Sequence, residues 1–222
     1  MRPVLSAIMA CYNGSNYLAE AIGGLYSQEL LIEILVMDDA STDGSARLAK
    51  QLGATVHTIP HSGQAVARNL GLPMAMGEFI LFHDQDDVLL PEVLPKMVAA
   101  LRAAPPVAAV MAQARDFLSP ELDSAERARL RPRAEPYFGY LGATLFRKDA
   151  LVAAGGFSET LKAGEAADLL LRLQASGPGP LRLPIVAMRR RIHKNNASRL
   201  MREQQFTEYA ASLRNHFLRP RE

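Results

Sequence analysis

Three carboxylates close together after an apolar segment are the strongest chemical feature of the sequence. Asp84, Asp86 and Asp87 follow the segment Phe79–His83, which is predicted to be a buried strand. Carboxylate oxygens are hard ligands, and Mg²⁺ or Mn²⁺ commonly bridges one or two of them to a diphosphate. The alternative is that Asp86 or Asp87 caps the helix predicted to begin near Pro91, which would explain one carboxylate and not the other two. The segment therefore predicts a site for a divalent metal and a nucleotide diphosphate.

Asp38 and Asp39 form a second acidic pair, after the apolar segment Ile32–Met37. One of them could cap the next helix or close a turn through Ser41 and Thr42. The functional interpretation is a hydrogen bond to a nucleotide base or ribose. The pair alone does not decide between these roles.

The hydrophobic pattern of residues 1–112 alternates short apolar segments with amphipathic ones. Strands are predicted at Val4–Ala10, Ile32–Met37, Ala54–Thr58, Phe79–His83 and Val107–Ala112, and helices at Tyr17–Ser27, Ala46–Leu52, Gln64–Leu72 and Pro91–Ala103. This alternation predicts βαβ units around a mainly parallel sheet in one compact α/β domain. Ligands bind beyond the carboxyl ends of the strands in such sheets, and both acidic clusters fall there.

The second half of the chain has a looser pattern. It predicts an irregular connection over Asp116–Pro136, strands at Thr144–Arg147 and Ile185–Met188, and a helix at Glu165–Ala175. Residues 201–222 are predicted to form a helical tail with an apolar stripe made of Phe206, Tyr209, Leu213 and Phe217. Such a stripe packs on the body of the protein, on a second subunit as in a homodimer, or on a membrane.

Charge and cysteine content limit the class of protein. The net charge is +2, too small by itself to indicate nucleic-acid binding. Residues 181–222 contain ten Lys and Arg against three Glu, which predicts either a contact with a phosphate group or anionic membrane surface, or a solvated helical face. Cys11 is the single cysteine and follows too short an apolar run for an export signal. No apolar run approaches the ~20 residues that span a bilayer. We expect a cytoplasmic protein, either free or peripheral to a membrane.

Four segments, in this order, resemble the family 2 glycosyltransferases: Ala7–Gly14, Leu35–Ser45, Ala67–Gly71 and Gly77–Asp87. Three later segments resemble the acceptor half of that family: Leu145–Asp149, Gly155–Glu159 and Gly164–Arg172. The resemblance implies a GT-A fold, with a nucleotide-sugar-binding half over residues 1–115, an acceptor-binding half over 116–200 and the helical tail over 201–222. It also implies transfer of a sugar, with inversion, from a nucleotide-diphosphate donor to a glycan, lipid-linked or small-molecule acceptor.

The resemblance assigns roles on the donor side. It implies that Tyr12 stacks on the donor base, that Asp39 hydrogen-bonds the base, and that Arg68 lies near the base or diphosphate. Asp84 would face the ribose and sugar.

The resemblance also implies a metal site within the Asp-x-Asp motif formed by residues 84–86. Asp86 would bind the Mn²⁺ or Mg²⁺ that bridges the two phosphates. His193 resembles a late histidine that completes the metal shell in some of these enzymes. The alternative is a surface histidine in a basic segment.

The sequence departs from the family at the catalytic base. The base is usually the Asp of a Glu-Asp pair that opens the late helix, and here the pair is Glu165-Ala166. An alanine methyl group cannot accept a proton, so Glu165 is the candidate base. Asp168 lies on the same helical face, where a structural role is favoured.

Three classes of function remain from the sequence. The first is a metal-dependent, inverting glycosyltransferase that adds single sugars, because the Gln-x-x-Arg-Trp motif of processive members is absent and the chain has no tryptophan. The second is a degenerate nucleotide-sugar-binding protein, which Ala166 motivates. The third is a nucleotidyltransferase, which would ordinarily show a longer Gly-rich phosphate loop than Asn13-Gly14-Ser15.

Overall fold

The structure is a computed structural model that describes residues 1–196 and 201–217. The described residues form an eight-stranded sheet, in the order β3-β2-β1-β4-β7-β6-β8-β5. The strands are β1 (Leu5–Cys11), β2 (Ile32–Asp38), β3 (Thr55–Thr58), β4 (Phe79–Phe82), β5 (Val88–Leu89), β6 (Ala109–Leu118), β7 (Thr144–Arg147) and β8 (Leu181–Ile192). The helices are α1 (Leu18–Tyr26), α2 (Ser45–Gln51), α3 (Gln64–Met74), α4 (Val93–Ala103), α5 (Ser124–Arg129), α6 (Lys148–Ala153), α7 (Glu165–Ala175) and α9 (Arg202–Phe217), with a 3₁₀ turn η1 (Leu141–Ala143).

The first four strands in space run parallel, as the alternating pattern predicts. β2 pairs in parallel with β1 and β3, and β1 pairs in parallel with β4. β7 is antiparallel to both β4 and β6, and β8 is parallel to β6. The carboxyl ends of β1, β2 and β4 therefore meet at one edge of the sheet, and the loops that follow them lie side by side.

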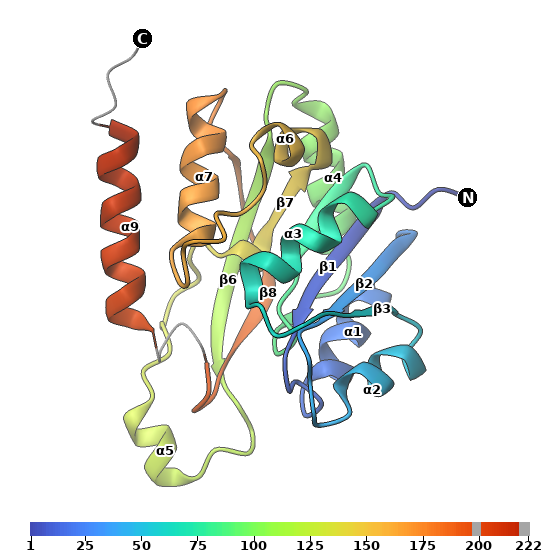
Figure 1. Cartoon of the computed structure of the whole chain (residues 1–222), viewed down its shortest axis with the longest axis vertical. Helices are drawn as coiled ribbons and strands as arrows, with labels where there is room; N and C mark the ends of the chain where they lie inside the picture. Colours follow the sequence, from blue (N-terminus) through green and yellow to red (C-terminus); the bar gives the residue numbers. More distant parts are fainter. Residues whose placement is uncertain (197–200, 218–222) are drawn as a thin grey trace.

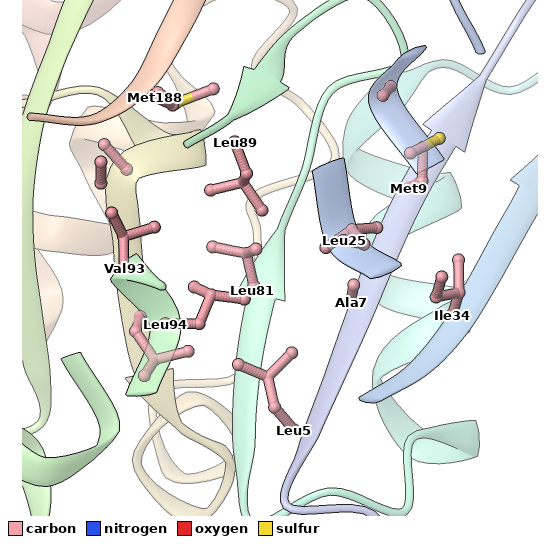
Figure 2. Packing of buried hydrophobic residues seen from close by; sticks show 14 of the residues in the cluster. Leu5, Ala7, Met9, Leu25, Ile34, Leu81, Leu89, Val93, Leu94 and Met188 are labelled. Atoms are coloured by element: carbon pink, nitrogen blue, oxygen red, sulfur yellow. The ribbon is translucent and has the colours of Figure 1, made fainter. Parts of the chain in front are cut away.

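Two apolar layers hold the sheet between helices (Figure 1). One cluster packs α1, α2 and α4 on one face, and the other packs α3, α6 and α7 on the opposite face. Figure 2 shows part of the first cluster, in which Leu5 and Leu81 of the sheet lie near Leu94 of α4. All three side chains are fully buried. Each such leucine contributes about 1.5–3 kcal/mol to folding, which makes the sheet a rigid support for its loops.

The prediction of an irregular connection over residues 116–136 is wrong in two places. β6 continues to Leu118, and α5 forms inside the connection with a capping box between Asp123 and Glu126. None of the residues of α5 is buried, so this helix carries no apolar periodicity that could reveal it. β8 is also longer than predicted, because its arginine-rich end continues to pair with β6.

The acidic cluster does not cap α4. The side-chain oxygen Oε1 of Gln28 accepts hydrogen bonds from the backbone N–H groups of Val93 and Leu94, at 3.1 and 3.0 Å. Asp86 and Asp87 bond elsewhere, as described below. The capping interpretation of these carboxylates is therefore wrong.

Helix α9 lies beside α7 at the edge of the molecule (Figure 1). Ser212 is buried and Leu213 is half-buried, whereas the side chains of Phe206 and Tyr209 are 75% and 41% exposed. The residues of the predicted apolar stripe therefore do not all pack against the rest of the protein. The side chain of Phe217 lies outside what the structure describes. In residues 1–196 and 201–217, every helix is too short or too polar to cross a bilayer.

Candidate functional site

Arg68 joins two carboxylates from distant parts of the chain. Its Nη2 donates to Oδ1 of Asp84 at 2.8 Å, and its Nη1 donates to Oε1 of Glu165 at 3.0 Å. α3 presents Arg68, the loop after β4 presents Asp84, and the first residue of α7 is Glu165. The arginine side chain is only 4% exposed, so these are charge-assisted contacts largely shielded from water.

The two carboxylates keep this arginine charged. Burial alone would lower the pKa of Arg68, but the nearby Asp84 and Glu165 raise it above its ordinary value. Oε2 of Glu165 is also buried, and it has no hydrogen-bond partner within residues 1–196 and 201–217. The site therefore holds a fixed cation next to a buried carboxylate oxygen without a partner among the described residues.

The position of α3 depends on a small residue facing the sheet. A Cβ atom on Gly71 would lie 2.7 Å from Cγ2 of Ile8 and 3.2 Å from Cγ of Met37. The next residue after Arg68 also fixes the helix, because the Asn69 side chain exchanges hydrogen bonds with the backbone of Phe157 at 2.9 and 2.8 Å. These contacts of the segment Ala67–Gly71 fix the position of α3 and therefore of Arg68.

Asp86 lies against the end of β8. Its Oδ2 atom is 2.8 Å from Nε2 of His193 and 3.4 Å from Nδ2 of Asn196. The backbone N–H of His193 donates to Oδ1 of Asn196 at 2.7 Å, which holds the turn that carries both side chains. The structure thus brings together the two residues predicted to bind a metal, and it places the histidine 7% exposed rather than on the surface.

Asp87 has separate partners. Its Oδ2 bonds the hydroxyl of Tyr140 at 2.7 Å, and its Oδ1 accepts from the backbone N–H of Arg191 at 2.8 Å. The same Tyr140 hydroxyl lies 2.9 Å from Oδ2 of Asp84. Burial, together with the charges of Asp86 and Asp84, raises the pKa of Asp87 well above its usual value. Asp84 and Asp87 therefore share the Tyr140 hydroxyl, whereas Asp86 bonds His193.

The end of β2 meets the loop before α3. The carboxylate of Asp39 accepts hydrogen bonds from the backbone N–H groups of Ser62 and Gly63, at 2.6 and 3.0 Å. His61 places its Nδ1 atom 3.0 Å from Asp39, and its ring centroid is 4.4 Å from that of Tyr12. Tyr12 is 47% exposed, so this edge presents an aromatic surface beside a buried carboxylate.

Gln85 connects the loop that carries Tyr12 to the loop that carries Asp84 and Asp86. Its side chain exchanges two hydrogen bonds with the backbone of Tyr12, at 2.9 and 3.1 Å. It stands between the two aspartates of the Asp-x-Asp motif, so the loop after β1 is tied to the loop after β4. Tyr12, Asp84 and Asp86 consequently lie on two connected loops at one edge of the sheet.

Several residues of this site carry no role in the sequence-based predictions: His61, Gln85, Tyr140, Arg191 and Asn196. His61 follows the third predicted strand, so the rule that ligands bind at strand ends could have found it. Arg191 and Asn196 flank the predicted His193. Tyr140 has no local signal, because the contacts of its hydroxyl with Asp84 and Asp87 depend on tertiary structure.

The arrangement can bind a flat aromatic group, an anion and a cation next to one another. Comparison with known proteins identifies the family of the chain: the profile of glycosyl transferase family 2 matches residues 6–158. The chain belongs to this family. The resemblance of its sequence motifs is therefore confirmed.

Curated relatives of this family 2 chain are mostly longer. The putative glycosyltransferase EpsE of Bacillus subtilis (strain 168) is 37% identical over 107 residues, which are 45% of this chain and 38% of EpsE. Succinoglycan biosynthesis protein ExoO of Rhizobium meliloti (strain 1021) is 27% identical over 224 residues, covering 90% of this chain and 64% of ExoO. The chain spans less than two thirds of the length of these relatives.

Solved structures confirm the predicted GT-A fold of this family 2 chain. The mannosyltransferase PcManGT from Pyrobaculum calidifontis, in complex with GDP-Man and Mn²⁺, has a TM-score of 0.73 at 21% identity, covering 96% of this chain and 65% of that one. S. aureus TarS 1-349 in complex with UDP-GlcNAc has a TM-score of 0.70 at 18% identity, covering 97% and 65%.

Proposed function

We propose that this chain transfers a single sugar, with inversion and in a metal-dependent reaction, from a nucleotide-diphosphate donor to an acceptor hydroxyl. The observation that carries the proposal is the approach of His193 to Asp86 at 2.8 Å, next to the Arg68–Asp84 pair. Two solved neighbours contain GDP-Man with Mn²⁺ and UDP-GlcNAc, which supports a donor of the same class.

The donor would lie across the loops at the strand ends. Tyr12 offers its exposed ring to the nucleotide base. Oδ1 of Asp39 accepts from Ser62 and can accept a second hydrogen bond, from a base N–H. Arg68 supplies positive charge near the diphosphate. Asp84 faces the ribose and sugar.

The donor set fits a divalent ion. Two neighbouring ligands about 2.1 Å from an octahedral ion are about 3 Å apart, and Oδ2 of Asp86 and Nε2 of His193 are separated by 2.8 Å. Within the described part of the chain, no three His, Cys, Asp or Glu side chains are placed to hold one metal ion together. The protein would therefore supply Asp86 and His193, and diphosphate oxygens and water would complete a Mn²⁺ or Mg²⁺ shell. Such an ion stabilises the negative charge that develops on the departing diphosphate.

Glu165 is the proposed general base. In an inverting transfer, the acceptor hydroxyl loses its proton as its oxygen bonds the anomeric carbon, and the nucleotide diphosphate leaves from the opposite side with the bonding electrons. Arg68 bonds Oε1 of Glu165, so the buried and unpaired Oε2 is the oxygen that would take that proton once the acceptor hydroxyl reaches it. Asp168 bonds Nε of Arg172 at 2.8 Å within α7, which supports a structural role for it.

A second function, binding of a nucleotide sugar without transfer, is favoured by two observations. Residue 166 is alanine, and the nearest carboxylate is engaged by Arg68. Substituting Ala166→Asp separates the two functions. If the chain lacks only a catalytic base, the substitution raises turnover of the donor and leaves nucleotide affinity unchanged.

A thermal-shift screen with UDP, GDP, dTDP and CDP, with and without Mn²⁺, tests the proposal directly. We expect one nucleotide to raise the melting temperature, and to raise it further with Mn²⁺. Incubation with the matching nucleotide sugars then measures hydrolysis or transfer. Binding without either reaction would favour the second function, and no stabilisation by any nucleotide would reject both.

We further propose that residues 1–115 bind the donor and that residues 116–200 bind the acceptor, a glycan, lipid-linked or small-molecule alcohol. The outward side chains of Phe206 and Tyr209 on α9 are available for a contact with an anionic membrane or a second copy of the chain. Vesicle flotation and sedimentation of the Phe206→Ser/Tyr209→Ser variant test that contact. Unchanged behaviour in both measurements would exclude it.

A further inference from the structure

Glu208 of α9 reaches across to the loop that precedes α7. Its Oε2 accepts hydrogen bonds from the backbone N–H groups of Ala163 and Gly164, at 2.9 and 2.8 Å. The N–H of Lys162 is shared between the two carboxylate oxygens, at 3.0 Å from Oε2 and 3.2 Å from Oε1. One carboxylate thus binds three consecutive backbone donors.

These donors stand at the beginning of a helix. Gly164 is the N-terminal cap of α7, and the N–H groups at a helix N-terminus have no acceptor within their own helix. A negative charge placed there is stabilised by the helix dipole. Partial burial alone would raise the pKa of Glu208, but the backbone donors and Gln204 lower it, so the side chain is ionised near neutral pH.

The two helices are close enough at this point to require a glycine. A Cβ atom on Gly164 would lie 2.7 Å from Cβ of Glu208 and 3.3 Å from its backbone carbon. One turn earlier on α9, Nε2 of Gln204 donates to Oε1 of Glu208 at 2.7 Å and orients the carboxylate. The contact therefore involves the backbone of both segments and not a single extended side chain.

We propose that Glu208 is a positioning residue for the active site. The residue that follows the Glu208-bound loop is Glu165, whose Oε1 is 3.0 Å from Nη1 of Arg68. By holding residues 162–164, Glu208 sets where α7 begins and so directs Glu165 toward Arg68. Helix α9, outside the matched family segment that ends at residue 158, becomes part of the site's framework. The inference rests on the proposed transferase function, because it assumes that Glu165 acts on the acceptor.

Glu208→Gln tests the proposal, with Glu203→Gln as the matched control. Both substitutions remove one negative charge from α9, but the side chain of Glu203 is exposed. We expect Glu208→Gln to lower kcat for turnover of the nucleotide sugar about tenfold, because a small misplacement of a reacting group is costly. The Kd for the nucleotide should change less than about twofold. Equal kcat values for the two variants would overturn the proposal, as would a loss of nucleotide affinity that parallels the loss of kcat.

A second measurement does not depend on turnover. The side-chain N–H signals of Arg68 in ¹⁵N-edited NMR report whether Glu165 keeps its place. They should shift in Glu208→Gln and stay unchanged in Glu203→Gln, and no shift in the first variant would overturn the proposal. If the unsubstituted chain binds nucleotide without turning over any donor, the transferase function fails, and these signals still decide whether Glu208 positions Glu165.

Discussion

Arg68 bonds Glu165 at 3.0 Å across 97 residues of sequence, with side chains that are only 4% and 10% exposed. The same guanidinium bonds Asp84, so one buried cation contacts two carboxylates and offsets the charge of one of them. Breaking a buried pair is costly because it leaves a charge without compensation.

Replacing this arginine should destabilise the fold. We expect Arg68→Met to lower the free energy of unfolding by about 3–5 kcal/mol, measured by urea denaturation. The control is Arg102→Met, because Arg102 pairs with Glu78 at the surface, where the side chains are 52% and 48% exposed. That pair should contribute no more than about 1 kcal/mol. An equal decrease in the free energy of unfolding of the two variants would show that the buried contacts of Arg68 stabilise the fold no more than a surface pair does.

The proposed base makes a kinetic prediction. Glu165→Gln keeps the size of the side chain and removes its ability to take a proton, so kcat should fall about 10²-fold or more while nucleotide affinity is retained. Asp168→Asn, three residues further along α7, should leave kcat nearly unchanged because Asp168 bonds Arg172. Undiminished turnover in Glu165→Gln would assign the proton to another group.

The proposed metal ligands predict a loss of metal dependence. We expect Asp86→Asn or His193→Ala to reduce the apparent affinity for Mn²⁺ about tenfold or more, since even residues behind the ligands contribute that much. The measurement is the additional thermal shift that Mn²⁺ produces in the presence of the bound nucleotide. Asp149→Asn, at the exposed start of α6, is the control. An unaltered Mn²⁺ response in Asp86→Asn would argue against this site.

The close packing of Gly71 against the sheet should affect both the stability of the fold and the binding of nucleotide. The Cβ atom in Gly71→Ala would press on Ile8 and Met37 and push α3 away from the sheet. We expect a loss of about 1–3 kcal/mol in the free energy of unfolding, together with weaker nucleotide binding because Arg68 moves with the helix.

The control for this substitution is a glycine with open space around it. A Cβ atom on Gly23, inside α1, would have no neighbour within 4 Å among the described residues. Gly23→Ala should therefore stabilise the chain by about 0.5–1 kcal/mol, because alanine restricts the unfolded state and favours the helix. A similar effect of both substitutions would contradict the tight approach of α3.

The lowered pKa of Asp43 should make the stability of the fold decrease as the pH falls through the acid range. Partial burial alone would raise the pKa of Asp43, but hydrogen bonds from Ser45 and Ser15 lower it to about 2, below its ordinary value of 3.8. A carboxylate with a depressed folded pKa stabilises the native state above its unfolded pKa, and the contribution disappears as the pH falls to the folded value. The urea midpoints of the unsubstituted chain and of Asp43→Asn should therefore differ at pH 5 and converge toward pH 2. A constant difference would contradict the shift.

The sequence by itself determined the alternation of strands and helices, the edge where the polar clusters fall and the family. The first strand could be predicted because burial on both faces gives a continuous apolar run, and the helix Glu165–Ala175 because Leu169 and Leu173 recur on its buried face. Helix α5 escaped prediction because it buries nothing. The motif residues could be assigned to one site because parallel strands end at a common edge.

Only the tertiary structure decided which side chains meet within that site. The sequence places Asp84, Asp86 and Asp87 within four residues. The fold sets Arg68 against Asp84 and His193 against Asp86, and it places the Tyr140 hydroxyl between Asp84 and Asp87. It also places Glu208 of the C-terminal helix on the loop before Glu165. These contacts join residues between 16 and 107 positions apart in the sequence. They leave no local pattern, because they depend on where whole loops come to rest after the core has packed.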